Sequence, residues 1–276
     1  MQLLADSGST KTTWCLYDST GQPVFTQRTA GLNPLLSSRE EIHRIVSGVR
    51  SALPHLPTAI QFYGSGCGDH ERQGQIGGVL EAVFPQTPTQ VAGDLLGAAR
   101  ALCGHEAGIA CILGTGMNSC HYDGHNISHQ VPSLGFILGD EGSGTYLGKR
   151  ILHDYFYGLT PTEISKSVAA QLPGDRSELL TRTYQSEAPA AFLAAFSHIL
   201  SAHRKNTYSQ QILAESFDAF CRLILAQYTT TLPVHFIGSI AQVFAPELGA
   251  ALARHGRQLG SIVTDPIPGL LRYHAD

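Results

Sequence analysis

The hydrophobic positions of this chain recur with two periods, one typical of strands and one typical of helices. The first hundred residues predict strands at 2–5, 12–17, 22–29, 59–63 and 89–92 and helices at 39–53, 72–83 and 94–103. In the first of these helices, Ile45, Val46 and Val49 recur at helical spacing, and Pro54 then ends the pattern. A meander of three strands followed by alternating helices and strands is typical of an α/β sheet.

The second half begins with a strand and then becomes mainly helical. The pattern predicts strands at 109–113, 234–237 and 258–263 and helices at 143–156, 162–171, 177–184, 189–205, 209–230 and 240–254. Pro266, Pro268 and Gly269 predict an irregular tail. We therefore predict two domains, residues 1–104 and residues 105–276, which meet without a Gly/Ser linker.

Two glycine-rich turns, more than a hundred residues apart, repeat one another. The first spans residues 6–12 and the second spans residues 114–119. Each follows an apolar strand, leads into a second strand and is followed by a polar turn. Glycine lets the backbone approach a ligand closely, and successive N–H groups in such turns bind anions. The repeat predicts a duplicated β-meander and a nucleotide-using enzyme that grips a polyphosphate with both turns.

Charge and cysteine content exclude several classes of partner. The net charge is −4 and charged residues make up 14% of the chain, so no basic surface for nucleic acid or for an anionic membrane is expected. The six cysteines are scattered without metal-ligand spacing, which is typical of buried thiols in a reducing compartment. The N-terminus does not resemble a signal peptide, and no apolar run approaches the ~18 residues of a membrane span. We expect a cytoplasmic protein that binds neither nucleic acid nor a membrane.

The first glycine-rich turn has the chemistry of a magnesium and phosphate site. Asp6 ends the first strand, where its carboxylate can hold the water shell of Mg²⁺, because Mg²⁺ usually binds through only one or two carboxylates. The residues expected to contact phosphates are Ser7, Gly8, Ser9, Thr10 and Lys11. An ordinary hairpin turn is the alternative, and the repeated turn at Gly114 favours the phosphate site.

Asp94 stands at the predicted start of a helix. From its position alone it is equally well a helix N-cap or a functional carboxylate, since an aspartate fills the N-cap readily. The two roles are compatible, because a helix N-terminus stabilises a carboxylate.

Four segments in order along the chain resemble the actin-like ATPase superfamily, which includes sugar kinases, heat-shock ATPases and actin. Residues 6–12 resemble its first phosphate loop and residues 114–118 its second; residues 135–143 are similar to a G-x-x-x-G-D-E-G-S signature; and residues 234–240 resemble the unit that holds adenosine. The closest resemblance is to the N-acetylglucosamine kinase branch, which shares a domain family with the BadF/BadG-type activator ATPases. The resemblance implies a two-domain, ribonuclease H-like α/β fold with a duplicated β-meander and βαβ core and a helix-rich second domain.

The resemblance also implies a role for each matching residue. It makes Asp94 the catalytic base that accepts a sugar hydroxyl proton. The remaining implied contacts are Gly114, Thr115 and Gly116 with phosphate, Gly238 and Ser239 with adenosine, and Asn33, Asn118, Gly135 and Asp140 with the sugar. Glu141, which follows in the signature, either caps the next helix or helps to position metal or hydroxyls, and its place in the first turn of a helix favours the cap.

The implied activity is transfer of phosphate from Mg²⁺-ATP to the 6-hydroxyl of N-acetylglucosamine, by a homodimer. One departure concerns the sugar: Leu134 stands where the sugar kinases commonly carry Trp, so another hexosamine is also open. Two alternatives are a BadF-type activator ATPase, which drives electron transfer, and a non-catalytic nucleotide-gated sensor. The characteristic cysteine segment of the activators is absent, and so are the DNA-binding extension and basic face of a DNA-coupled sensor.

Overall fold

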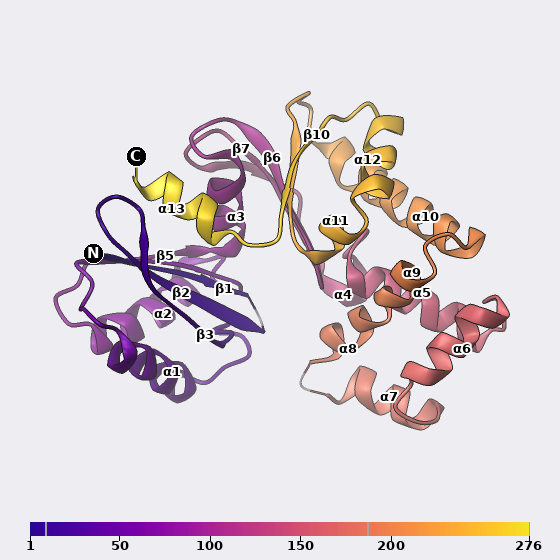
Figure 1. Cartoon of the computed structure of the whole chain (residues 1–276), viewed down its shortest axis with the longest axis horizontal. Helices are drawn as coiled ribbons and strands as arrows, with labels where there is room; N and C mark the ends of the chain where they lie inside the picture. The colour runs from indigo at the N-terminus through magenta and orange to yellow at the C-terminus, as the bar shows by residue number, and fades with distance from the viewer. Residues whose placement is uncertain (9, 187, 276) are drawn as a thin grey trace. The chain divides into compact units, whose positions relative to one another are not determined.

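The computed structural model describes residues 1–8, 10–186 and 188–275 (Figure 1). Contacts within the chain group these residues into two units. The first unit contains residues 1–107, the hairpin tip Tyr122–Ile127 and the C-terminal segment from Asp265 onward. The second unit contains Gly108–His121 and Ser128–Thr264. The chain therefore leaves the first unit and returns to it at its end.

The first unit is built on a mixed five-stranded sheet in the order β3-β2-β1-β4-β5. Its strands are β1 (Gln2–Ser7), β2 (Lys11–Tyr17), β3 (Pro23–Ala30), β4 (Ala59–Gly64) and β5 (Thr89–Gly93). The strands β1, β2 and β3 form the antiparallel meander predicted from the sequence, while β4 and β5 run parallel to β1. In this register Ser7, Gly64 and Gly93 lie side by side at the carboxyl ends of three parallel strands.

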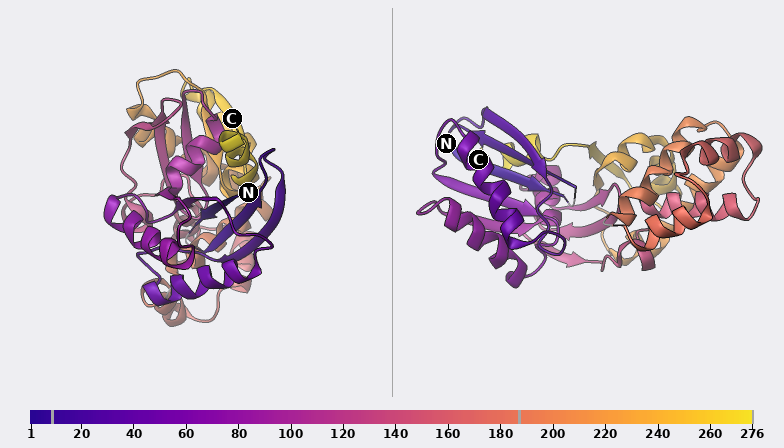
Figure 2. Two further views of the ribbon diagram at one scale, coloured as in Figure 1. Left: turned by 90° about the vertical axis from the view of Figure 1, so that its left-hand side faces the viewer. Right: turned by 90° about the horizontal axis from the view of Figure 1, so that it is seen from below.

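Two pairs of helices cover the two faces of this sheet. One face carries α1 (Arg39–Ala52) and α2 (His70–Val83), which lie over the sheet in the view from below (Figure 2). The side chains of Ser38 and Asp69 cap these two helices. The other face carries α3 (Asp94–Cys103) and α13 (Ile267–Ala275), which pack against each other and against β1. The α/β class predicted from the sequence is confirmed.

The last helix is held to the first unit by a polar and aromatic cluster as well as by apolar contacts. Arg100 of α3 donates from Nη1 to the hydroxyl of Tyr63, 2.8 Å away. That hydroxyl lies 2.9 Å from Nε2 of His274 in α13. The Arg100 guanidinium also lies over the ring of Tyr273 in the same helix, 4.8 Å from the ring centre. Burial, followed by the charge of Arg100, lowers the pKa of His274 to about 4, so the imidazole is neutral at pH 7.

The second unit repeats the strand order of the first. Its sheet runs β10-β9-β6-β7-β8, with β6 (Gly108–Leu113), β7 (Met117–Tyr122), β8 (Ile127–Gln130), β9 (Val234–Ile237) and β10 (Leu259–Val263). Each of the two sheets thus places a three-strand meander beside two later strands, and β9 pairs parallel to β6 as β4 does to β1. The duplication predicted from the two glycine-rich turns is present.

Helices fill most of the second unit. They are α4 (Gly135–Leu138), α5 (Gly144–Phe156), α6 (Thr162–Gln171), α7 (Arg176–Tyr184), α8 (Pro189–Ala195), α9 (Ser197–Ala202), α10 (Thr207–Leu223), α11 (Ser239–Val243) and α12 (Ala245–Arg254), with a 3₁₀ turn at Leu225–Gln227. Buried residues of β6, β9, α5, α10 and α12 form one continuous apolar core. This confirms the expected helix-rich second half.

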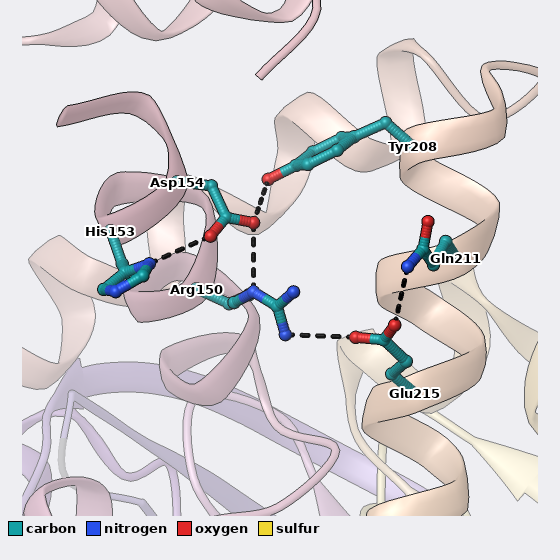
Figure 3. A network of polar contacts seen from close by, with 6 residues as sticks. All are labelled: Arg150, His153, Asp154, Tyr208, Gln211 and Glu215. Carbon is teal, nitrogen blue, oxygen red and sulfur yellow. Dashed lines mark hydrogen bonds and ion pairs between the residues drawn. The ribbon is translucent and has the colours of Figure 1, made fainter. Parts of the chain in front are cut away.

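A buried carboxylate joins α5 to α10 beside this core (Figure 3). Asp154 is only 2% exposed, and its carboxylate accepts hydrogen bonds from Arg150 at 3.0 Å, from the Tyr208 hydroxyl at 2.9 Å and from His153 at 2.9 Å. Arg150 in turn pairs with Glu215 of α10. Although burial alone raises the pKa of Asp154, these hydrogen bonds together hold it below its ordinary value.

Several predicted elements differ from the structure, three of them for identifiable reasons. The single helix predicted at 189–205 is two helices, and at the junction the Ser197 hydroxyl bonds the Ala194 carbonyl, 2.7 Å away, a contact that bends helices. The helix predicted at 240–254 is divided because Pro246 has no N–H to continue the ladder. The tail expected to be irregular is helix α13, because its prolines fall at the helix start, where their missing N–H is tolerated.

Within the described part of the chain, no helix is long and apolar enough to cross a membrane. The structure shows no disulfide among the cysteines there, of which five are buried and Cys103 is partly buried.

We predict that Tyr208→Phe destabilises the second unit. It removes a hydrogen bond to a buried carboxylate, a loss of about 1.5–3 kcal/mol for a bond to a charged group. Denaturant unfolding of the variant measures this loss. Tyr184→Phe is the control, because Tyr184 is 79% exposed and should unfold like the unchanged protein. Equal stability of both variants would mean that the Asp154 cluster does not hold the two helices together.

Candidate active site

In the first unit, the predicted phosphate turn is a tight hairpin between β1 and β2. The Gly8 N–H donates to the Lys11 carbonyl, 2.9 Å away, and closes the turn. Thr10 and Lys11 are exposed there, whereas Ser7 is fully buried. Ser9, another residue of the predicted phosphate set, lies outside the described residues. Among its described residues, the turn therefore presents backbone and the exposed side chains of Thr10 and Lys11 at the carboxyl end of β1.

The Asp6 carboxyl at the end of β1 experiences an unfavourable environment for its charge. Burial is the largest cause that raises its pKa to about 7, and the carboxylates of Asp94 and Asp265 raise it further, while Lys11 lowers it. A divalent cation would relieve this repulsion. Among the residues that the structure describes, no three His, Cys, Asp or Glu side chains are grouped so as to ligate a metal by themselves. A hydrated Mg²⁺ held through one or two carboxylates fits these residues.

Asp94 is the first residue of α3, and it is not the capping residue. The N-cap is Gly93, which has no side chain to bond the helix, so the N-cap alternative for Asp94 does not hold. The N–H groups of Asp94 and Leu95 bond the Asp94 carboxylate and lower its pKa, but burial outweighs them and the pKa is raised. Gly93 pairs with Gly64, and Gly64 pairs with Ser7, so these three residues form a row at the ends of the parallel strands. Asp94 directly follows Gly93, and Asp6 directly precedes Ser7, so the two aspartates flank this row.

Asp265 is a site residue that the sequence reasoning missed. It lies just before α13 in the first unit, and its carboxylate accepts a hydrogen bond from the Ile267 N–H, 3.0 Å away. Its charge acts on Asp6, as described above. An aspartate followed by prolines is a sequence signal for the start of a helix. In this segment, however, the two prolines and the glycine favoured the prediction of an irregular tail.

Asn33 is a buried residue of the loop after β3. It is 7% exposed, and its side-chain oxygen accepts a hydrogen bond from the Leu35 N–H, 2.9 Å away, so the loop forms an Asx turn. The Gly64–Gly68 loop packs on it: a Cβ on Gly66 would lie 2.1 Å from that same oxygen. Only glycine fits at position 66, whose φ of +78° also favours it.

In the second unit, the second glycine-rich turn is held by the start of α5. The Gly114 N–H donates to the Gly116 carbonyl at 3.0 Å, and the N–H groups of Gly144 and Thr145 donate to the carbonyls of Gly114 and Thr115 at 2.8 and 3.0 Å. These bonds use the first amides of the helix to fix the carbonyls of the turn.

Gly238 brings the predicted adenosine unit against the same turn. Its φ is +134°, and a Cβ there would lie 2.4 Å from the Leu113 carbonyl oxygen and 3.0 Å from the Gly114 nitrogen. Glycine is therefore required at position 238 both by its backbone conformation and by close packing. Ser239 follows as the first residue of α11. The second phosphate turn and the adenosine unit, which are distant in sequence, thus lie together.

Asp140 also lies against the second turn. Its φ of +65° is rare for a residue other than glycine, and such conformations concentrate at functional sites. Its carboxylate accepts a hydrogen bond from the Met117 N–H at 3.2 Å, and a Cβ on Gly116 would lie 3.0 Å from it. Burial is the largest cause of its raised pKa, whereas its hydrogen bonds and Lys149 lower the pKa.

The remaining signature residues have separate positions in the second unit. The Asn118 side-chain oxygen accepts hydrogen bonds from the Ser119 N–H and from Gln130, at 3.0 and 3.1 Å. Gly135 begins α4 with a φ of +71°. Glu141 does not cap α5 as expected, because the Ser143 hydroxyl accepts the capping hydrogen bond from the Tyr146 N–H.

Comparison with solved structures identifies the family. A protein from Porphyromonas gingivalis, provisionally named an N-acetylglucosamine kinase, is 37% identical with a TM-score of 0.94, and the match covers 100% of this chain and 99% of that protein. The chain belongs to the N-acetylglucosamine kinase family. The predicted two-domain actin-like ATPase fold is confirmed, and by family the chain is an ATP-dependent sugar kinase.

Two more distant structures show the same fold. A provisionally named N-acetylglucosamine kinase from Chromobacterium violaceum is 22% identical with a TM-score of 0.77, over 99% of this chain and 98% of that one. A ROK family glucokinase from Streptomyces griseus in complex with glucose and AMPPNP is 14% identical with a TM-score of 0.62, over 98% and 97%. No protein-family model matches the chain, and a comparison with curated proteins also finds no match.

We predict that Asp6 makes the first unit less stable as the pH rises. Its folded pKa of about 7 exceeds the ordinary 3.8, so the folded state binds more protons than the unfolded state between these values. The stabilisation that protonated Asp6 provides is complete below 3.8 and is lost as the pH rises through about 7. Asp6→Asn should flatten the pH dependence of the free energy of unfolding over this range, measured by denaturant titration at several pH values. An unchanged slope would contradict the raised pKa of Asp6.

Asp265→Asn should lower the pKa of Asp6. Asp265 raises that pKa by like-charge repulsion, so removing its charge should move the Asp6 titration toward its ordinary value. Carboxyl-carbon NMR of the two proteins measures the shift. Asp123→Asn is the control, because this exposed carboxylate is bonded within its own turn. If Asp6 titrates alike in all three proteins, Asp265 is not part of the site.

Proposed function

We propose that this chain phosphorylates a hexosamine, with the 6-hydroxyl of N-acetylglucosamine as the preferred acceptor and Mg²⁺-ATP as the donor. The name of the 37% identical relative favours this substrate. The observation that carries the proposal is the position of Asp94, a partly buried carboxylate at a helix start, in the same unit as the Asp6 turn and directly after a strand end that is level with the end of β1.

In the first unit, the proposal assigns phosphate and metal binding to the β1–β2 turn. Asp6 would hold Mg²⁺ through water, with Asp265 nearby, and Asn33 would bind the sugar. The residues proposed to bind phosphates are Ser7, Gly8, Ser9, Thr10 and Lys11. When bound, Mg²⁺ supplies charge that balances the phosphates of ATP. Lys11 is exposed and able to reach a ligand.

In the second unit, the proposal assigns the nucleotide to the turn held by α5. Backbone groups of Gly114, Thr115 and Gly116 would contact phosphate, and Gly238 and Ser239 would contact adenosine. The close packing of Gly238 on Leu113 and Gly114 supports a joint role for these two segments. The residues proposed for the sugar are Asn118, Gly135 and Asp140.

Asp94 would act as the general base. Its ionised carboxylate accepts the proton of the attacking sugar hydroxyl as the phosphoryl group is transferred. Burial raises its pKa and so strengthens it as a base, while the first amides of α3 stabilise the ionised form. The same helix start therefore serves to keep the base charged and to hold it in position.

The identity of the sugar is tested by a panel of acceptors. Leu134 is 60% exposed at the start of α4 and offers no aromatic surface on which a sugar ring could stack. A coupled assay of ADP release should compare N-acetylglucosamine, glucosamine, N-acetylmuramic acid, N-acetylmannosamine and glucose. We expect N-acetylglucosamine to give the highest kcat/KM, with the product phosphorylated at the 6-hydroxyl. ADP release that no sugar stimulates would favour an activator-type ATPase instead.

We predict that Asp94→Asn lowers kcat by about 10²–10⁴, the usual loss for a general base. The fold and ATP affinity should be retained, as measured by thermal unfolding and calorimetry. Asp69→Asn is a matched control, because Asp69 caps α2 at another helix start in the same unit, and asparagine caps equally well. If the Asp94 variant keeps most of its turnover, the carboxylate is not the base.

A further inference from the structure

The Ser7 hydroxyl lies where the first phosphate turn meets the Asn33 loop. Ser7 is 0% exposed and ends β1, directly before the turn. Its Oγ accepts a hydrogen bond from the Leu32 N–H, 2.9 Å away, and lies 2.7 Å from the hydroxyl of Thr12, the first residue after the turn with a buried side chain. One side chain thus contacts both strands that flank the turn and the backbone next to Asn33.

The two hydroxyls have several partners. They lie 2.7 Å apart, and either of them can donate to the other. The Thr12 hydroxyl can also donate to the Ala30 carbonyl, 3.1 Å away, and the Ser7 hydroxyl to the Leu32 carbonyl, 3.3 Å away. Ser7 and Thr12 are both fully buried, so neither hydroxyl can exchange a lost bond for water. The loop and the turn therefore cannot separate without leaving a buried polar group unsatisfied.

The Ser7 backbone makes a further connection to the Gly64–Gly68 loop. The Ser7 carbonyl accepts a hydrogen bond from the Ser65 N–H, 2.7 Å away. Gly66 of the same loop packs directly on Asn33. Asn33 is therefore connected to Ser7 by two routes. One runs along the chain through Leu32, and the other runs through the Gly64–Gly68 loop, in which Gly66 packs on Asn33.

We propose that Ser7 and Thr12 are positioning residues that couple nucleotide binding at the first phosphate turn to sugar binding at the Asn33 loop. The proposal rests on the proposed function for the two ligands. Phosphate that orders the turn fixes Ser7, and Ser7 fixes the Leu32 amide and the loop. When the second ligand binds, the turn and the loop are already ordered, so its binding loses less conformational entropy. Each ligand therefore tightens the binding of the other.

This role differs from direct phosphate binding by the Ser7 side chain. A hydroxyl that ligates phosphate would strengthen nucleotide binding whether or not sugar is present. A hydroxyl that only stabilises the fold would change both affinities without changing their dependence on each other. A coupling hydroxyl leaves the separate affinities nearly unchanged and alters that dependence.

Calorimetry of N-acetylglucosamine binding, with and without Mg²⁺ and a non-hydrolysable ATP analogue, measures the coupling. We expect the analogue to tighten sugar binding ~5-fold or more in the unchanged protein, the lower end of common coupling energies. Thr12→Val, at a residue outside the proposed phosphate set, should reduce this factor toward 1, and Thr12→Ser, which keeps the hydroxyl, should retain it. Ser197→Ala is the matched control, because it removes a buried, bonded hydroxyl from α9. Equal coupling in all the variants, or nucleotide affinity lost in Thr12→Val without sugar, would overturn the proposal.

Hydrogen exchange of the Leu32 amide tests the coupling without any sugar. The nucleotide analogue should slow this exchange in the unchanged protein and in Thr12→Ser, but much less in Thr12→Val, which retains the Leu32–Ser7 bond. This result would stand even if the chain proved to act on a different acceptor. A nucleotide that leaves Leu32 exchange unaltered in the unchanged protein would overturn the coupling.

Discussion

The constraint on which the first unit depends is the burial of like charges at the ends of parallel strands. The strands β1, β4 and β5 end level with one another, and Asp6 and Asp94 flank this row of ends. Burial and mutual repulsion make the charged form of Asp6 costly. Such an arrangement opposes stability, and proteins keep costly charges mainly where function needs them. The helix start of α3, the turn after β1 and the segment before α13 all position these charges.

The second unit uses the same strand order with a different chemistry. Its turn is fixed by the first amides of α5, and Gly238 packs against it so closely that no side chain fits there. Backbone hydrogen bonds hold the turn of the second unit, whereas charged carboxylates surround the corresponding turn of the first unit. Under the proposed function, the duplicated fold has two sites of unlike character, one for a hydrated cation and the other for a nucleotide that approaches the backbone closely.

Sequence patterns predicted most of this fold because each element carries local signals. The strand β9 and the helices α3 and α6 have the predicted bounds, and the repeated turns indicated the duplication. The sequence also placed Asp94 at a helix start, although only the structure shows that Gly93 is the N-cap. Asp265 was missed because its relation to Asp6 depends on the chain returning to the first unit, which no local pattern records. The contact of Ser7 with Leu32 was hidden for the same reason, since it joins residues that are separated by two strands.

The return of the C-terminal helix has a consequence for synthesis of the protein. Helix α13 covers part of the first sheet, and Tyr63 and Arg100 meet His274 only when that helix is present. These residues follow the whole second unit in the chain, so a ribosome releases them after that unit. The first unit, although encoded earlier, therefore remains without one of its covering helices until the second unit has been synthesised, and nascent chains must keep the apolar face around Leu4 and Cys15 from associating with other chains.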